Sequence, residues 1–426
     1  MINSKISPWA WVSSLYFAQG IPYVVVMSVA VIMYKRLGIS NSEIALYTSW
    51  LYLPWVIKPF WSPFIDIIKT KRWWILSMQL LIGAGLGAVA FVIPAPFFFQ
   101  VSLAVFWLIA FSSATHDIAA DGFYMLALDS SQQSFFVGIR STFYRLAMIS
   151  GQGLLIILAG RIEQQTNNIS LAWSITFMVL CGLFVCAFVY HRFVLPIPKS
   201  DKLSQQTSSH ELFFEFGKTF VTFFQKKGIL PAIAFMLLYR LGEAMLVKIS
   251  SPFMLDARAL GGLGLTTTEV GVTYGTVGVI ALTLGGILGG IVASRRGLKF
   301  WIWPMALSIT LPNVVYVYLS AMLPDNIWIV NIAVAFEQFG YGFGFTAYML
   351  YLIYISDGEH KTAHYALCTG FMALGMMLPG MAAGCLQELV GYQNFFLIIM
   401  LCTIPTLLVL PFLKIDRNFG RKIDTQ

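Results

Sequence analysis

Apolar runs of membrane-spanning length recur along the whole of this sequence, and they constrain its fold more than any motif does. Of its 426 residues, 58% are hydrophobic and only 11% are charged, which lies far from the composition of soluble domains. About 20 apolar helical residues cross the roughly 30 Å hydrocarbon core of a bilayer. The sequence therefore predicts an all-α membrane protein with many spans.

Twelve such runs can be delimited, arranged as six before and six after the longest polar interval. The first run begins after Pro8 and has no small-residue cleavage site, so it is expected to be a retained span and not a signal peptide. The approximate boundaries are 9–34, 44–67, 73–93, 97–128, 134–160, 170–195, 228–256, 268–294, 298–323, 326–356, 361–388 and 391–413.

The distribution of Lys and Arg predicts that both termini are cytoplasmic, because these residues are retained preferentially on that side during insertion. The basic positions expected inside are Lys5, Lys69, Lys71, Arg72, those between 192 and 227, Arg295, Arg296, Lys299, Lys361 and the cations of the tail. Only Lys35, Arg36, Arg161 and Arg258 are then outside. The net charge of +8 is explained by a surface facing anionic lipid and indicates no nucleic-acid partner.

The polar interval predicts two halves, at 1–195 and 228–426, joined by a cytoplasmic linker at 196–227. Its Ser, Gln and Lys content favours a solvated connector. An amphipathic helix over 211–227 is the alternative, since that stretch also carries Phe and Leu. The five cysteines lie in apolar runs without metal-ligand spacing, so no disulfide, metal or cofactor is expected.

The loops after the second and eighth runs echo each other. GGIVASRRGLKFW at 289–301 resembles the Gly-x-x-x-Asp-Arg-x-Gly-Arg/Lys signature of the major facilitator superfamily, and SPFIDIIKTKRWW at 62–74 occupies the corresponding place. Each copy departs from the signature: Asp66 lacks the Arg and Gly that should follow, and Ser294 stands where the acid belongs. The resemblance implies the major facilitator fold, in which two halves rock around a site at mid-membrane.

Polar segments inside the spans resemble one branch of that superfamily more closely, the AmpG family of muropeptide permeases. The resemblance implies proton-coupled import of anhydro-muropeptides across the bacterial inner membrane, for peptidoglycan recycling. At His116 this sequence departs from the Gln expected in that family. The segments that carry the resemblance are LPWVIKPFWSPFID at 53–66, SATHDIAAD at 113–121, LLYRLGEAM at 237–245, EVGVTYGTVGVIALTLGGILGG at 269–290 and FEQFGYGFGFTAY at 336–348.

The residues alone also mark SSATHDIAADGFYM at 112–125 as a functional site. Asp117 and Asp121 are four apart, so they project from one face of a helix that is otherwise apolar. Ionised groups in the membrane are costly and mark ion or substrate pathways. We expect Asp117, Asp121 and the adjacent His116 to take part in proton coupling, unless one acid is tied permanently to a cation such as Arg145.

The seventh and tenth runs contribute a second charged set. Arg240 and Glu243 lie three apart, Lys248 follows two turns after Arg240, and Glu337 lies in the tenth run. Glu243 and Glu337 are further candidates for proton coupling, although an Arg240–Glu243 pair with only a structural role is an open alternative. The cations and polar side chains expected to bind the carboxylates, amides and sugar rings of a substrate are Arg145, Arg240, Lys248, Lys58, Gln19, Gln152, Tyr144 and Tyr239. Arg140 lies near a span end and is expected to snorkel toward water.

Glycines within the spans are interpreted as packing positions and not as nucleotide loops, because no soluble strand precedes them. Gly285, Gly286, Gly289 and Gly290 have the small-xxx-small spacing that lets helices approach closely. Prolines such as Pro22 and Pro312 predict kinks.

The sequence thus predicts a proton-coupled importer of muropeptide-like sugar peptides. Carriers of another bulky anion, such as a siderophore or acyl-CoA, are the nearest alternative. A drug/proton antiporter is disfavoured because SGQGLLIILAG at 150–160 lacks the Gly-Pro element of such exporters. A membrane-embedded acyltransferase using His116 lacks a nucleophile or metal constellation, and a receptor that transports nothing would leave the intramembrane charges without a use.

Overall fold

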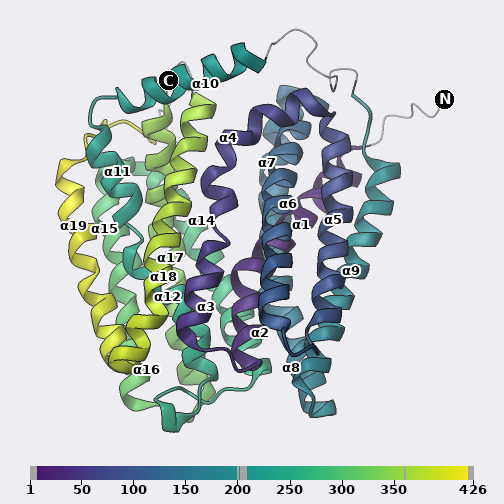
Figure 1. Ribbon diagram of the computed structural model, residues 1–426. Coiled ribbons are helices and arrows are strands. Elements are labelled where there is room, and N and C mark those ends of the chain that lie inside the picture. The colour runs from purple at the N-terminus through teal and green to yellow at the C-terminus, as the bar shows by residue number, and fades with distance from the viewer. Residues whose placement is uncertain (1–6, 199–200, 202–208, 359–360, 421–426) are drawn as a thin grey trace. The chain divides into compact units, whose positions relative to one another are not determined.

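A computed structural model describes residues 7–198, 201, 209–358 and 361–420, and these residues form helices and loops, with no strand among them (Figure 1). The expected all-α membrane fold is therefore confirmed. Lys5 and the last cations of the tail, which entered the orientation argument, lie outside the described residues.

The chain divides into two compact units, 1–37 with 57–208, and 38–56 with 209–426. Helix α4, Leu53–Ile68, begins in the second unit and continues in the first. The other helices of the first unit are α1 Pro8–Val24, α2 Ala30–Arg36, α5 Lys71–Val92, α6 Phe98–Ala127, α7 Ser130–Ile149, α8 Ile156–Thr166 and α9 Ile169–Val194, with π-helical turns at Val25–Val29 and Ser150–Leu155.

The second unit contains the remaining helices. They are α3 Asn41–Trp50, α10 Ser209–Phe224, α11 Ile229–Leu238, α12 Leu241–Leu255, α13 Thr267–Val270, α14 Val279–Arg296, α15 Leu298–Thr310, α16 Val314–Met322, α17 Ile327–Ser356, α18 Lys361–Leu401 and α19 Thr403–Val409, with a π-helical turn at Gly271–Gly278 and 3-10 turns at Arg258–Leu260, Leu311–Asn313 and Leu410–Phe412.

Nine continuous helical stretches among the described residues are long and apolar enough to cross a membrane. One of them, Ala363–Phe412, contains two predicted spans. The chain turns between these spans at Gly391, whose φ of 76° is left-handed, but the helical stretch is not interrupted there. The count of twelve stays a prediction, since helix breaks decide how many stretches qualify.

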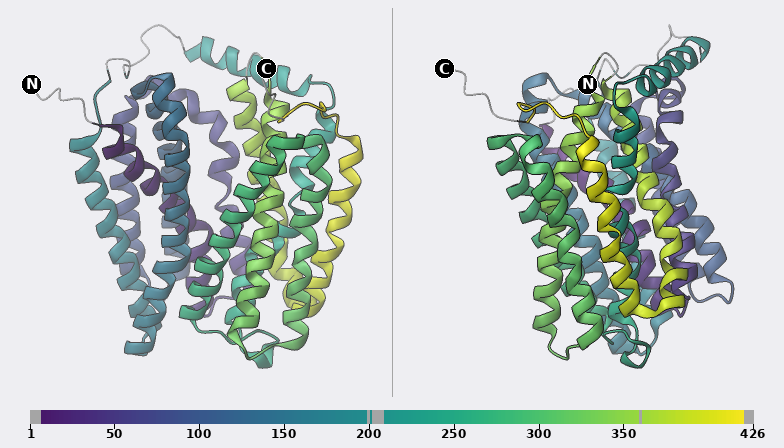
Figure 2. Two further views of the ribbon diagram at one scale, coloured as in Figure 1. Left: turned by 180° about the vertical axis from the view of Figure 1, so that it is seen from behind. Right: turned by 90° about the vertical axis from the view of Figure 1, so that its left-hand side faces the viewer.

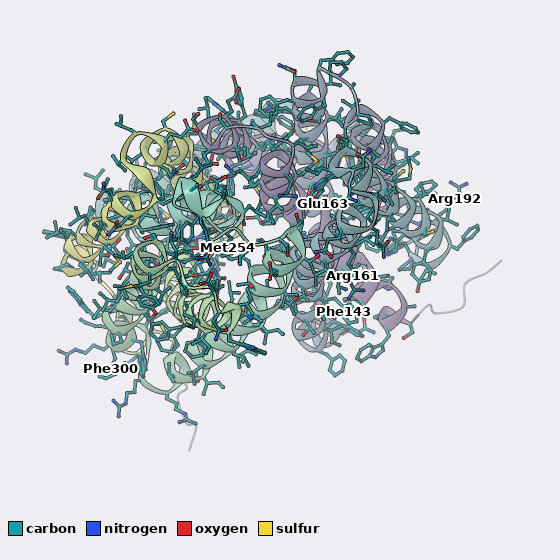
Figure 3. All side chains as sticks on the ribbon, turned by 90° about the horizontal axis from the view of Figure 1, so that it is seen from below. Phe143, Arg161, Glu163, Arg192, Met254 and Phe300 are labelled. Atoms are coloured by element: carbon teal, nitrogen blue, oxygen red, sulfur yellow. The ribbon has the colours of Figure 1, made fainter. Side chains whose placement is uncertain are left out.

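The first unit begins and ends at the same end of its bundle. The Tyr190 hydroxyl near the end of α9 donates to the Ala10 carbonyl near the start of α1, at 2.6 Å. At the opposite end, Glu163 of α8 accepts from Arg36 of α2 at 3.2 Å and from the Trp173 indole of α9 at 2.9 Å. Figure 3 looks onto that end, where Arg161 and Glu163 are labelled. An even number of crossings follows for this unit.

The second unit also begins and ends at one end. Lys226 donates to the Ile355 and Asp357 carbonyls at 2.6 and 2.7 Å, after the last turn of α17. Burial lowers the pKa of this amine. The Leu298 amide donates to the Phe419 carbonyl at 3.0 Å, which ties the start of α15 to the tail.

The polar interval is not only a solvated connector, because its second part forms α10. Phe223 of α10 is buried and stacks on Phe371 of α18, with ring centroids 6.1 Å apart. The Thr222 hydroxyl lies 3.2 Å from His364 Nε2, also on α18. The alternative of a helix over this stretch is therefore confirmed.

The segment 38–56 packs with the second unit, although it precedes the linker by more than a hundred residues. Asn41 Nδ2 donates to Gln387 Oε1 at 2.6 Å and to the Tyr392 hydroxyl at 2.9 Å. All three side chains are buried. These polar contacts fix α3 against α18, and they bring residues of α3 close to the charged residues of α12.

Glycines allow α14 and α17 to pack with their backbones in contact, as the small-residue spacing predicts. The two helices lie side by side within the green group of Figures 1 and 2. A Cβ atom added to Gly285 would lie 2.1 Å from the Phe339 carbonyl oxygen, and one added to Gly342 would lie 2.0 Å from that of Leu282. No side chain larger than hydrogen fits at either position.

We expect Gly342→Ala to force α14 and α17 apart and to destabilise the protein by about 1–3 kcal/mol. Gly290→Ala, at an exposed position of α14, is the control, because a Cβ there meets nothing within 4 Å. Thermal unfolding in detergent measures both variants. Equal melting temperatures for the two variants would show that this close contact contributes nothing to stability.

Candidate functional site

Helix α6 carries the acidic pair in the first unit. Asp117 and Asp121 lie one helical turn apart, and each is held by side chains from other helices of the same unit. Their side chains are 23% and 37% exposed within the structure, so water can reach them. The apolar run around them packs the buried face of α6, on which Ala119, Ala120 and Phe123 are fully buried.

Asp117 is tied to α1 and α4. Its two carboxylate oxygens accept hydrogen bonds from the Gln19 amide nitrogen and the Lys58 ammonium. Gln19 and Lys58 were both expected to bind substrate. In the structure both contact this acid, and Lys58 is its ion-pair partner, while their role in substrate binding stays a prediction.

Asp121 is tied to α1 and α7. It accepts from the Tyr16 hydroxyl at 2.9 Å and pairs with an Arg140 nitrogen at 3.2 Å. The Arg140 guanidinium carbon also lies 4.5 Å from the centre of the Tyr16 ring and 5.2 Å from that of Tyr124. Sequence reasoning expected Arg140 to snorkel to water. Its fork reaches Asp121 because α7 places it beside α1 and α6, which its position in the sequence did not reveal.

The charges of this group balance within the first unit. The two acids Asp117 and Asp121 face the two cations Lys58 and Arg140, in one ion pair each. The pairs involve α4, α6 and α7, and the hydrogen bonds from Gln19 and Tyr16 add α1. The acidic group is therefore the point at which these helices are held together.

His116 is separated from this acidic group. Its Nε2 atom lies 3.1 Å from the Gln79 amide nitrogen of α5, and the ring is 1% exposed. No hydrogen-bond partner is described for its Nδ1 atom. The His116 side chain therefore points toward α5 and does not share the contacts of its sequence neighbour Asp117. The sequence analysis missed Gln79, although an amide in an apolar span requires a partner and could have been noted.

The second unit buries its charged set on α12 and α17. Arg240, at the start of α12, contacts the Tyr341 hydroxyl, and its guanidinium carbon lies 4.9 Å from the centre of the Phe345 ring. Glu243 is 2% exposed, and neither of its carboxylate oxygens has a hydrogen-bond partner among the described residues. Glu337 is 1% exposed and accepts from its neighbour Gln338 at 3.0 Å.

Lys248 of α12 is fixed by α3. Its ammonium donates to the Thr48 hydroxyl at 2.9 Å and lies 5.2 Å from the centre of the Tyr52 ring. The side chain is 1% exposed, and no carboxylate pairs with it in the described part of the chain. Thr48 gave no sequence signal, because only the packing of α3 brings it to α12.

Other predicted substrate residues lie elsewhere. Gln152 donates to the Ser28 hydroxyl at 2.8 Å, joining two π-helical turns. Tyr239 is 1% exposed and donates to the Gly344 carbonyl at 2.9 Å, so it packs in the helix core. Tyr144 lies where α7 contacts Gly20 of α1, and Arg145 follows it on α7, partly exposed. No group of His, Cys, Asp and Glu side chains suited to a metal ion occurs among the described residues.

Comparison with known proteins places this geometry in a family. The family model described as "Major Facilitator Superfamily" matches residues 12–353. The chain belongs to the Major Facilitator Superfamily. It is thus a multi-pass membrane transporter of a small molecule and not an enzyme, which removes the acyltransferase alternative.

Relatives within the superfamily carry the AmpG name, so the AmpG-like resemblance is confirmed. A Rickettsia conorii protein named as transporter AmpG 4 is 26% identical over 95% of this chain and 96% of its own length. The Escherichia coli K12 anhydromuropeptide permease is 24% identical over 84% of this chain and 70% of its own length. The crystal structure of a D-xylose-proton symporter has the same fold, with a TM-score of 0.73 and 12% identity over 99% of this chain and all of that one.

The Lys58–Asp117 pair can be tested by a double-mutant cycle. We expect Lys58→Met to destabilise the protein by about 1–3 kcal/mol, less than a fully buried pair would show, because both side chains are partly exposed. Adding Asp117→Asn to Lys58→Met should recover most of that loss, since no charge is then left unpaired. Melting temperatures of the two single variants and the double variant measure the coupling, and strictly additive losses would mean that the pair does not form.

Proposed function

We propose that this chain imports anhydromuropeptide-like sugar peptides, driven by protons that bind the acidic group of α6. The observation that carries the proposal is the attachment of Asp117 and Asp121 to three other helices through the side chains of Gln19, Lys58, Tyr16 and Arg140. The names of the relatives, AmpG and anhydromuropeptide permease, support the substrate class.

Protonation of this group would loosen the helices that it holds. A carboxylate attracts an ammonium or guanidinium, whereas a neutral carboxylic acid keeps only a hydrogen bond. When Asp117 takes up a proton, Lys58 loses its counter-charge, and α4 is released from α6. The same event at Asp121 releases Arg140 and α7. Proton binding thereby changes which helices move together, as coupling requires.

The second unit supplies cations for the acidic groups of the substrate. Lys248 is held by a hydroxyl and an aromatic ring, so its charge stays available for a carboxylate. Arg240 contacts the Tyr341 hydroxyl in the same way. The Glu243 carboxylate has no described hydrogen-bond partner, although its charge interacts with that of Arg240, and it is a second candidate to take up a proton. A peptide carboxylate bound at Lys248 or Arg240 would replace neutral contacts with charge-assisted ones.

The bacterial inner membrane, with both termini in the cytoplasm, is the proposed location. In the second unit the end of α14 and the starts of α15 and α18 carry Arg295, Arg296, Lys299 and Lys361. Lys226 and the tail contact the same region. The positive-inside tendency favours this end as cytoplasmic. Import toward this side follows the direction of the inward proton gradient.

The coupling can be tested in proteoliposomes with an imposed pH gradient and labelled GlcNAc-anhydro-MurNAc-peptide. With one proton per substrate, a gradient of one pH unit should concentrate the substrate about tenfold. Asp117→Asn and Asp121→Asn should reduce the accumulation to about the external concentration, with melting temperatures reported alongside.

Gly290→Ala serves as the control, because it alters neither charge nor packing. Accumulation by wild-type protein that ignores the gradient would refute proton coupling. Wild-type accumulation by both Asn variants would refute the assignment to these two acids. A labelled siderophore and acyl-CoA, offered in the same assay, test the alternative substrates.

Substrate recognition by Lys248 has a separate test. We expect Lys248→Gln to weaken binding of the acidic muropeptide about tenfold, because a hydrogen bond to a charged group is worth about 1.5–3 kcal/mol. An analogue with amidated peptide carboxyls should lose at most about threefold. Isothermal titration in detergent measures both ligands, and equal losses would assign Lys248 a structural role.

A further inference from the structure

A chain of hydrogen-bonding side chains crosses the interior of the first unit from α6 to α1. His116 Nε2 lies 3.1 Å from the Gln79 amide nitrogen, and the Gln79 oxygen lies 3.0 Å from His191 Nδ1. His191 Nε2 lies 3.0 Å from the Ser14 hydroxyl. The first three side chains are at most 1% exposed. Four helices each contribute one member, and α5 and α9 lie side by side in Figure 1.

The chain ends at a hollow on the first unit. Ser14 and His191 line this hollow, whose volume is about 660 Å³. Phe143, labelled in Figure 3 at the outer edge of this unit, forms part of the same wall. The other polar lining residues are Ser13, Ser150, Cys186 and Tyr190. Water that enters this hollow therefore reaches one end of a chain whose other end is His116, on the face of α6 that points to α5.

The positions of the amide atoms define the direction of the hydrogen bonds. Gln79 presents its NH2 group to His116, so His116 Nε2 accepts and a neutral ring carries its proton on Nδ1. Gln79 presents its oxygen to His191, so His191 Nδ1 donates and its Nε2 accepts from Ser14. Each ring is then neutral with its proton on Nδ1.

Protonation of His116 is incompatible with that arrangement. An imidazolium carries hydrogen on both nitrogens, so His116 Nε2 would face the NH2 group of Gln79 donor to donor. Rotation of the amide brings its oxygen to His116 and its NH2 group to His191 Nδ1, which must then accept. His191 can satisfy this only with its single proton on Nε2, donating to Ser14.

Ser14 can complete this reversal. Its hydroxyl lies 3.3 Å from both the Ala10 and the Trp11 carbonyl oxygens, so it can accept from His191 while donating to one of them. From His116 Nε2 to the Ser14 hydroxyl, both directions of the chain therefore pair a donor with an acceptor at every step. The change consumes one proton, at His116. His191 exchanges its Nδ1 proton for one on Nε2, the nitrogen that faces Ser14, so the charge of its ring does not change.

We propose that Gln79 and His191 are positioning residues that make the protonation state of His116 and the tautomer of His191 change together. This inference rests on the proposed function. It gives the first unit a proton-binding group in addition to Asp117, and it links the protonation of that group to the tautomer of His191 at the hollow. His116 then adds a pH-dependent element that a Gln at this position would lack.

Other charged and titratable groups lie near the chain and can influence the pH at which His116 becomes protonated. On α6 these are Asp117 and Asp121, which face Lys58 of α4 and Arg140 of α7. On α9, Tyr190 and Cys186 line the hollow, and Arg72 of α5 reaches the Arg192 carbonyl beyond His191. Both acids are paired with cations, and the charge of Asp117 also interacts with His116.

Nitrogen NMR of the full-length protein in lipid bilayers, with ¹⁵N-labelled histidine, tests this proposal without any transport measurement. The ring signals distinguish the two neutral tautomers and the imidazolium. In wild-type protein we expect His116 to become protonated and His191 to move its proton from Nδ1 to Nε2 with one common pH midpoint. His116→Gln and His191→Asn assign the signals.

Variants separate a coupled chain from two independent rings. In Gln79→Leu the midpoints of His116 and His191 should separate by at least ~0.5 pH unit, and in His116→Gln the His191 tautomer should no longer change with pH. Thr176→Val is the matched control on α9, because Thr176 bonds only to Ala172 of its own helix among the described contacts, and it should retain the common midpoint.

The wild-type titration decides the matter even if Gln79→Leu fails to fold. Separate midpoints in wild-type protein, or a His191 tautomer that still changes in His116→Gln, would overturn the proposal. A failure of gradient-driven uptake in proteoliposomes, with a common midpoint retained, would instead reject the proposed transport function and leave the chain intact. In uptake assays, Gln79→Leu should change the pH profile and not only the maximal rate.

Discussion

The structure depends on compensating charged side chains inside helices that are otherwise apolar. A carboxylate in such an environment costs several kcal/mol unless a cation or hydrogen-bond donors face it. In the first unit this requirement is met completely for Asp117 and Asp121, each with a cation and a neutral donor. The compensating side chains come from three other helices, so electrostatic balance also determines how these helices pack.

The second unit meets the same requirement differently. Lys248 and Arg240 contact hydroxyl groups and aromatic rings. Glu243 has no described hydrogen-bond partner, and its charge interacts with that of Arg240. The charges of this set are therefore less completely compensated by ion pairs and hydrogen bonds than those of the acidic group of α6. Groups with unused hydrogen-bonding capacity can gain most from a ligand or a proton. This difference between the units is the reason for proposing that the second unit binds the acidic solute.

His116 shows how position along a helix can mislead. It adjoins Asp117 in the sequence, yet on a helix consecutive side chains point about 100° apart. Its ring consequently joins Gln79 and His191 and not the two acids. The three residues expected to take part in proton coupling therefore belong to two separate polar groups on different faces of α6. Asp117 and Asp121 form ion pairs, and His116 forms a hydrogen bond to a neutral amide.

The sequence by itself determined the membrane class and the acidic residues of α6, because hydropathy and charge in an apolar run are properties of composition and spacing. The superfamily came from the resemblance of its motifs to those of known members. It also indicated the glycine seam of α14 and α17. Only the tertiary structure decided that Arg140 and Lys58 face these acids, that Tyr239 lies in the core, and that segment 38–56 packs with the second unit. Those outcomes depend on which faces of distant helices meet. Helical periodicity determines which residues share a face, but not which other helix that face packs against.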